Sequence, residues 1–200
     1  MVDINETASN LLEKIAKYLE KPYNAMALGG GIAFVILLLY HTRSLGGSYF
    51  FGPFFTFLHV VSGITWIGLL YYFNLVQIPT MPKVPPELKP GVGKYIAPEA
   101  LFWYRWAMVA TVATGAIVLM SGAATVNFTL ITGIVLGLLM AFNVWFIIWP
   151  NQQKALGLVP AEDDEKMRSA RLAMLTSRAN FVLSVPMLFC MVTAPLVAGG

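Results

Sequence analysis

The sequence predicts an all-α integral membrane protein: a bundle of five transmembrane helices with an N-terminal amphipathic helix in the membrane interface. Hydrophobic residues make up 58% of the 200 residues and charged residues only 12%, which excludes a water-soluble fold of this size and a disordered chain. The charged residues stand between long apolar runs. They are therefore topology signals and not a phosphate-binding surface, so we expect the lipid bilayer as a partner and no nucleic acid.

Five apolar stretches approach the roughly 20 residues that a spanning helix needs. They are Tyr23–Tyr40, Phe54–Ile78, Trp106–Met120, Phe128–Trp149 and Phe181–Val197. Before the first of them, apolar residues recur at helical spacing with lysines on the other faces, which is typical of an interfacial helix. We assign residues 1–22 to this helix, with Asp3 and Glu6 at its start and Pro22 at its end, and residues 23–200 to the transmembrane domain. The alternative is an ordinary helix packed on a partner protein.

The positions of the basic residues predict the orientation of the chain. Arg43 is the only basic residue in the connections on one side, and the other twelve lie on the opposite side, which is then cytoplasmic. We therefore expect a bacterial inner-membrane protein with a cytoplasmic N-terminus, a periplasmic C-terminus and cytoplasmic loops 79–105 and 150–180. The first span is expected to be an uncleaved anchor, because no small-residue cleavage site follows it.

The two cytoplasmic connections differ in composition. The first contains six prolines between Pro79 and Pro98, so we expect extended chain there and not a continuous helix. The second has an acidic run at 162–165 followed by basic residues up to Arg171, which favours a helix that leads into the fifth span.

Small residues at intervals of four predict where the spanning helices touch, because lipid gives helices little hydrophobic reason to associate. Gly133, Gly137 and Ala141 form such a row on the fourth span, and Thr111 and Gly115 form another on the third. Pro186 lies inside the fifth span, where we expect a kink.

His59 is the most informative polar residue of the spans, because an imidazole in hydrocarbon is costly unless it has a partner. Gly63 and Trp66 follow it at i+4 and i+7 on the same helix face. This pattern fits a ligand of haem b iron, with the glycine leaving room for the porphyrin and the tryptophan stacking on it. The alternative is that His59 simply forms a hydrogen bond to a neighbouring helix.

His41 ends the first span on the same side of the membrane as His59 and is the candidate for a second axial ligand; the alternative is an interfacial residue. The single cysteine, Cys190, excludes an intrachain disulfide, a cysteine-based metal site and the C-x-x-C-H attachment of a c-type haem within these residues.

Several polar residues near the cytoplasmic helix ends are candidates for substrate or anion binding. Arg105 and Arg178 suit a planar acid or a haem propionate, or else they snorkel in an aromatic belt. Asn143 and Asn180 either contact a substrate or form a hydrogen bond across helices. No carboxylate lies within a span, which argues against a proton relay built on Asp or Glu.

Two sequence blocks carry a family resemblance: Leu58 to Gly68 followed by Tyr71, Tyr72 and Phe73, and the run from Asn143 to Lys154. A third block runs from Ser177 through Asn180 to Phe189, and Lys94–Tyr95 with the aromatic run Phe102–Trp106 precedes the third span. Together these blocks resemble the membrane-bound urate hydroxylases, that is, the urate oxidase N-terminal type of membrane domain. The second span alone is also similar to membrane haem-binding protoporphyrinogen oxidases.

The resemblance implies an inner-membrane protein related to urate oxidation that passes electrons to a cytochrome c domain. It also implies that His59, Trp66, Asn143, Gln152 and Asn180 are functional positions. This sequence departs from the family pattern in lacking the cytochrome c domain, in having fewer spans and in carrying Ala179 beside Asn180, where family members tend to have histidine.

We therefore expect an inner-membrane redox protein that binds haem b through His59 and hands electrons to a separate cytochrome c-type acceptor. The alternative is a cofactor-free accessory subunit that stabilises a larger respiratory or oxygenase complex through its small-residue faces. A transporter is disfavoured by the absence of intramembrane carboxylates and of paired broken helices.

Overall fold

The computed structural model describes residues 4–44 and 50–197; this part is mainly helical, with short turns and loops between the helices, and it contains no β-strand. The chain forms two compact units, residues 1–53 and residues 54–200. The all-α class expected from the sequence is confirmed.

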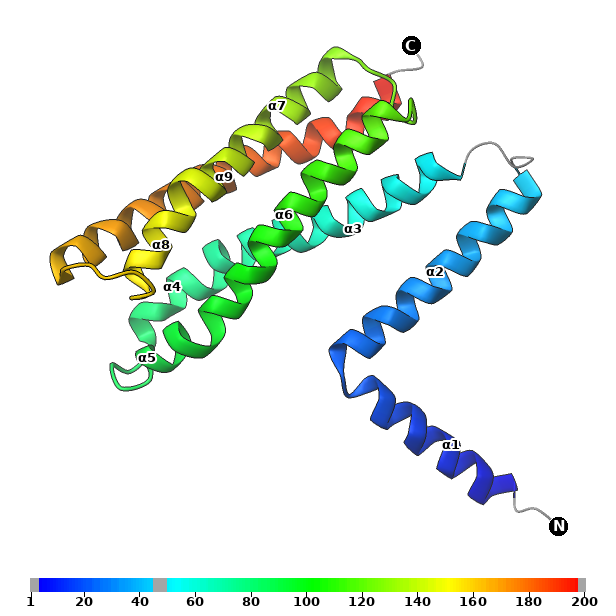
Figure 1. Ribbon diagram of the computed structural model, residues 1–200, viewed down its shortest axis with the longest axis horizontal. Helices are drawn as coiled ribbons and strands as arrows, with labels where there is room; N and C mark the ends of the chain where they lie inside the picture. Colours follow the sequence, from blue (N-terminus) through cyan, green and yellow to red (C-terminus); the bar gives the residue numbers. More distant parts are fainter. Residues whose placement is uncertain (1–3, 45–49, 198–200) are drawn as a thin grey trace. The chain divides into compact units, whose positions relative to one another are not determined.

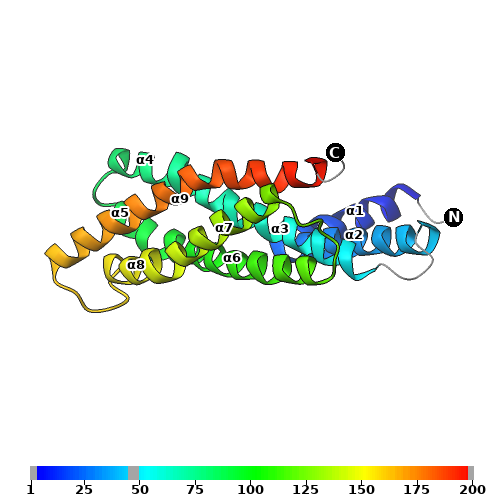
Figure 2. The same cartoon turned by 90° about the horizontal axis from the view of Figure 1, so that it is seen from above.

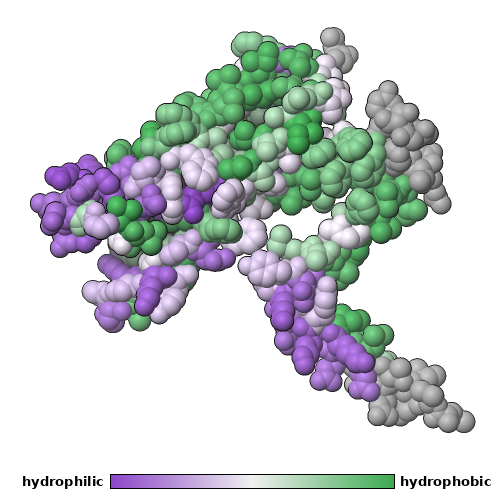
Figure 3. All heavy atoms as spheres, in the orientation of Figure 1, coloured by the Kyte–Doolittle hydropathy of each residue, from purple (hydrophilic) through white to green (hydrophobic). Residues whose placement is uncertain are grey.

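The first unit consists mainly of two helices, α1 (Ile4–Leu19) and α2 (Pro22–Ser44). The helix predicted for the amphipathic segment is present, and the chain turns at Lys21 where Pro22 begins α2. Figure 3 shows hydrophilic residues along one side of α1 and hydrophobic residues along the other. Asp3, the predicted cap of α1, lies outside the described residues.

The second unit contains the other four long helical segments (Figures 1 and 2). Their elements are α3 (Phe51–Tyr71), η1 (Tyr72–Gln77), α4 (Ile78–Thr80) and η2 (Met81–Lys83); α5 (Lys89–Gly91), η3 (Val92–Ile96) and α6 (Ala97–Met120); α7 (Phe128–Phe142), η4 (Asn143–Ile148) and α8 (Trp149–Ala155); and α9 (Asp163–Val197). With α2, the described residues hold five helical segments long and apolar enough to cross a membrane, as predicted.

Apolar side chains cover most of the outer surface of the second unit, including Phe146 and Val182, which are each 68% exposed. Hydrophilic residues gather at the end of this unit where α4, α5, α8 and the start of α9 lie (Figure 3). A surface of this kind fits contact with lipid acyl chains along the helices and with water at that end. The chain is a membrane protein.

The expectation of extended chain between Pro79 and Pro98 is wrong, because only residues 84–88 leave the helical conformation. Pro90 occupies the second position of α5, which begins a new helical run after residues 84–88, so this proline removes no helical hydrogen bond. Pro79 and Pro98 instead follow π-helical segments within helical runs that continue.

Widened helical turns explain how the helices pass through three of the prolines. The π-helical segments η1, η3 and η4 each end two residues before a proline, namely Pro79, Pro98 and Pro150. In each case the residue between them donates its backbone N–H to a carbonyl five positions earlier instead of four. The wider turn relieves the clash that a proline ring makes with the preceding turn, so the helix continues.

The second connection agrees better with the prediction. A helix does begin at the acidic run, at Asp163, and it continues without a break to Val197. Gly157 adopts a positive φ of 70° in the turn before it, a conformation that a glycine adopts without strain. An ion pair of 2.6 Å between Lys154 Nζ and Glu165 Oε1 joins α8 to the start of α9. Pro186 lies inside α9, and the kink expected there stays a prediction.

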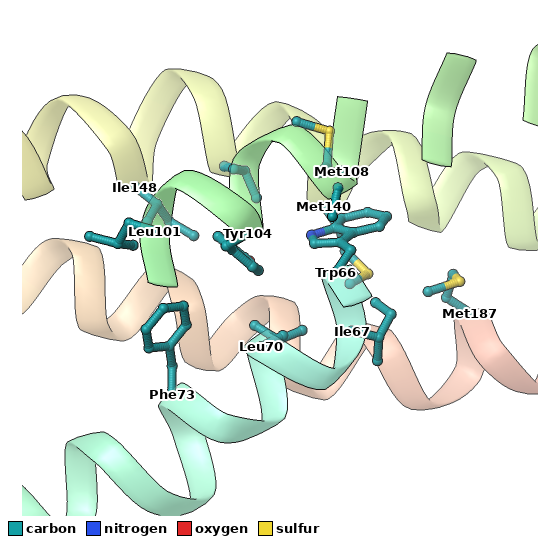
Figure 4. Packing of buried hydrophobic residues seen from close by; sticks show 12 residues of the cluster. Trp66, Ile67, Leu70, Phe73, Leu101, Tyr104, Met108, Met140, Ile148 and Met187 are labelled. Atoms are coloured by element: carbon teal, nitrogen blue, oxygen red, sulfur yellow. The ribbon is translucent and has the colours of Figure 1, made fainter. Parts of the chain in front are cut away.

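The core of the second unit is a cluster of side chains from α3, η1, α6, α7, η4 and α9. Leu70 and Met140 are fully buried at its centre, and Trp66 lies beside Met108 and Met140 in Figure 4. On α9, the buried residues repeat every three or four positions, and most are small or polar. They are Ser169, Ala173, Ser177, Asn180, Ser184, Met187, Cys190 and Ala194.

The predicted small-residue row on the fourth span is confirmed as the contact between α7 and α9. A Cβ atom at Gly133 would lie 3.0 Å from the Cβ of Cys190 and 3.2 Å from the Cε of Met191. At Gly137 the corresponding distance to the Cγ of Met187 is 3.9 Å. Asn127 fastens the end of this contact, since its side chain accepts from Leu130 N–H at the start of α7 and donates to the Ala194 carbonyl.

Gly133→Leu is expected to lower the free energy of unfolding in detergent micelles by about 2 kcal/mol, because the added side chain overpacks the contact with Cys190. The matched control is Gly68→Leu, since Gly68 has open space around it. Unfolding can be followed through the reaction of the single, buried Cys190 with a thiol dye and checked by circular dichroism. Equal effects of the two substitutions would contradict this packing.

Candidate functional site

His59 lies on α3 and packs directly against the backbone of α6. Its Nδ1 is 2.8 Å from the carbonyl oxygen of Thr111. A Cβ atom at Gly115 would lie 2.8 Å from the His59 Cε1 and 2.9 Å from Nδ1, so only glycine accommodates the ring at this position. Thr111 and Gly115, the row predicted on the third span, therefore form the seat of the imidazole.

The contact with Thr111 fixes how the neutral imidazole carries its proton. A carbonyl oxygen only accepts hydrogen bonds, so Nδ1 must be the donor and Nε2 keeps its lone pair. Metal-ligating histidines are oriented in the same way, by an N–H to a carbonyl on the nitrogen that does not bind the metal. His59 thus has both the hydrogen bond to a neighbouring helix and a nitrogen suited to ligation.

Gly63 and Trp66 were expected to line a haem site beside His59, but protein atoms already cover both residues. Trp66 is 2% exposed and belongs to the core cluster between the helices, so its ring faces are already covered. The Cγ2 of Thr111 lies 3.8 Å from the Cβ position of Gly63, which fills the room expected there for a porphyrin. His59 is suited to bind the haem iron, whereas Gly63 and Trp66 have no free space beside them for the porphyrin. The side chain of His41 lies outside the described part of the chain.

The two asparagines predicted as site residues meet in the interior. Asn143 Nδ2 donates to Asn180 Oδ1 over 2.8 Å, and Asn180 Nδ2 donates to the Met140 carbonyl over 3.0 Å. This carbonyl lies at the end of α7, just before the π-helical η4. Asn180 is fully buried, so the pair links α9 to the α7–η4 segment as the cross-helix interpretation predicted.

Tyr104 was not expected from the sequence to be a site residue; it is 2% exposed and lies beside the Asn180 and Trp66 side chains. The Tyr104 hydroxyl and Trp66 Nε1 form no hydrogen bond of regular geometry with a described residue, although Asn180 and Trp66 both lie close enough to interact with this hydroxyl. Asn74 was missed as well; its Nδ2 donates to the Leu70 carbonyl and to Ser177 Oγ. The sequence pattern that could have identified Asn74 is its spacing: Asn74 follows the apolar Leu70 at i+4 and so lies on the same helix face.

Arg105 lies on α6, eight residues after its first residue, Ala97, and its guanidinium carbon is 3.1 Å from the centre of the Trp149 ring. Its Nε is buried without a partner, and no described carboxylate forms an ion pair with it. A guanidinium held on an aromatic face keeps its edge available for a planar oxyanion such as a carboxylate.

The remaining candidates are not gathered around Arg105 by any described hydrogen bond. Gln152 is half-buried on α8, and Arg178 is exposed on α9. Arg105 and Thr111 are six positions apart on α6, which separates them by roughly 120° around the helix axis. Arg105 and the His59 seat therefore face different neighbours of α6.

Residues 107–197 match the model of a protein family described as "Urate oxidase N-terminal". This match confirms the resemblance identified from the sequence. It includes Asn143, Gln152, Arg178 and Asn180 and most of α6, whereas the block around His59 and Trp66 lies before it. No curated protein and no solved structure matches the chain.

A double-mutant cycle tests the His59 seat. Gly115→Ala is expected to lower the free energy of unfolding by about 1–3 kcal/mol, because the added methyl overlaps the imidazole. In a His59→Ala background the same change should be neutral or stabilising, since alanine is the better helix former. The control is Gly63→Ala, whose nearest neighbour is at an ordinary contact distance. Additive effects of His59→Ala and Gly115→Ala would refute the contact.

Proposed function

We propose that this chain is a redox protein of the bacterial inner membrane, related to the urate oxidase N-terminal family, in which His59 binds haem b. The observation that carries this proposal is the 2.8 Å contact between His59 Nδ1 and the Thr111 carbonyl, which leaves Nε2 as the metal-binding nitrogen. When bound, the haem would supply one-electron transfer.

The residues around His59 would orient its imidazole and would not themselves carry electrons. Gly115 lets the imidazole approach α6, and the Thr111 carbonyl holds the ring in one orientation and one tautomer. Because Gly63 and Trp66 lie against protein atoms, we place the haem on the open side of the imidazole and not between α3 and α6. His41, the other candidate ligand from the sequence, belongs to the first unit, and its side chain lies outside the described residues.

The electron acceptor is proposed to be a separate cytochrome c-type protein or a membrane complex. These 200 residues contain one cysteine and hence no attachment site for a c-type haem of their own. The uneven distribution of basic residues supports a cytoplasmic N-terminus and a periplasmic C-terminus. In this orientation His59 lies toward the periplasm, where such an acceptor is accessible.

The second candidate function is that of a cofactor-free accessory subunit. It is favoured because Gly63 and Trp66 are packed against protein atoms. In this case His59 would serve only to hold α3 against α6, and the apolar outer surface would bind other membrane subunits as well as lipid.

An optical spectrum distinguishes the two functions. Protein expressed with a haem precursor is expected to show a b-type reduced-minus-oxidised signal that His59→Ala abolishes. Thr132→Ala on α7 is the control, because its hydroxyl donates only to its own helix, at Phe128. A folded wild-type protein that stays colourless after haem addition, and copurifies in stoichiometric amount with other subunits, would reject the haem proposal in favour of the accessory one.

We further propose that Arg105 binds the anionic edge of a planar organic acid. Arg105→Gln is expected to weaken the binding of urate, used as the probe, by about 10-fold to 100-fold, the range for losing a charged hydrogen bond. Arg171→Gln is the control, since Arg171 is an exposed arginine of α9 that was not a candidate for anion binding. Calorimetry on protein in nanodiscs measures both affinities. Equal losses, or no urate binding by the wild type, would contradict a specific role of Arg105.

A further inference from the structure

Buried polar atoms without partners are concentrated on two neighbouring segments of the second unit. Within the described residues these side-chain atoms are Trp66 Nε1, Asn74 Oδ1, Gln77 Oε1, Tyr104 OH and Arg105 Nε. All of them belong to the α3–η1 segment or to α6. Native proteins leave few such groups unsatisfied, and ordered water is the usual partner of those that remain.

Three of these residues, Trp66, Asn74 and Tyr104, lie near a row of polar residues on α9 that includes Ser177 and Asn180. Tyr104 lies beside Trp66 and Asn180. Ser177 precedes Asn180 by about one turn on α9 and accepts the hydrogen bond from Asn74 over 3.0 Å. Trp66, Asn74, Tyr104 and Asn180 are each at most 3% exposed.

The same series leads out of the core. Gln77 follows Asn74 by three positions on η1, directly before α4 at the hydrophilic end of the unit. The side-chain oxygens of Asn74 and Gln77 are both without partners, and η1 is π-helical, a widened turn that is frequent at functional sites.

We propose that bound water molecules complete this series into a hydrogen-bonded path by which water enters at the Gln77 end and reaches Tyr104 and Trp66. The path contains hydroxyl, amide and indole groups and no carboxylate, so water must provide both the donors and the acceptors between them. The path does not depend on haem binding by His59.

Deuterium exchange at the Trp66 indole N–H measures water access to the inner end of the path. The protein is labelled with ¹⁵N at its indole nitrogens, placed in nanodiscs and transferred to D₂O, and the Trp66 signal is assigned by its loss in Trp66→Phe. A plug variant, Asn74→Leu with Ser177→Ala, replaces both partners of the hydrogen bond between η1 and α9 by apolar side chains. We expect the plug to slow the exchange at Trp66 at least tenfold, and Gln77→Leu to slow it similarly.

Ser184→Ala is the matched control, because Ser184 is also fully buried on α9 but lies on the other side of Asn180 from Ser177. Its effect should stay within twofold. Exchange that is as slow in the wild type as in the plug variant would show a dry core and overturn the proposal. Exchange unaffected by Gln77→Leu would overturn the assigned entrance. Melting followed at Cys190 establishes that each variant is folded.

Discussion

The constraint on which this structure depends is that hydrocarbon offers no hydrogen-bond partner, so each polar group of the spans must find one inside the protein. His59 meets it through the Thr111 carbonyl, and Asn180 meets it through Asn143 and the Met140 carbonyl. Each of these bonds joins two helical segments. The polar residues of the spans therefore hold the bundle together at points where apolar contact alone would not fix the register of one helix against another.

The same constraint explains the treatment of the prolines. A proline inside a spanning helix leaves a carbonyl without its usual donor, which is costly in lipid. At Pro79, Pro98 and Pro150 the preceding residue bonds five positions back, so the helix absorbs the proline as a widened turn. The turn before Pro79 carries Asn74 and Gln77, and that before Pro150 begins at Asn143. Widened turns and buried or half-buried amide side chains thus occur together at two of the three sites.

Hydropathy predicted the helices well because the membrane leaves few alternatives to a long apolar helix. The row at Gly133 and Gly137 was likewise readable, since a close approach of helices requires small residues at fixed intervals. The π-helical turns could not be predicted from the sequence. Prolines indicate where a regular helix is disfavoured but not whether a wider turn will accommodate the proline ring. The role of Gly115 was missed for a related reason. Its partner, His59, lies on another helix, and sequence spacing contains no information about which helices face each other.

His59 shows why a structural and a functional interpretation of one residue need not compete. The hydrogen bond that would satisfy a purely structural imidazole is the same bond that a metal ligand needs on its second nitrogen. Removing His59 would therefore disturb both packing and ligation, and loss of a spectrum in such a variant acquires meaning only beside a measurement of folding. Gly115 separates the two effects. A change there displaces the ring without removing its nitrogen, so a packing role predicts a loss of stability alone, whereas a ligand role predicts that the haem signal changes with the position of the ring.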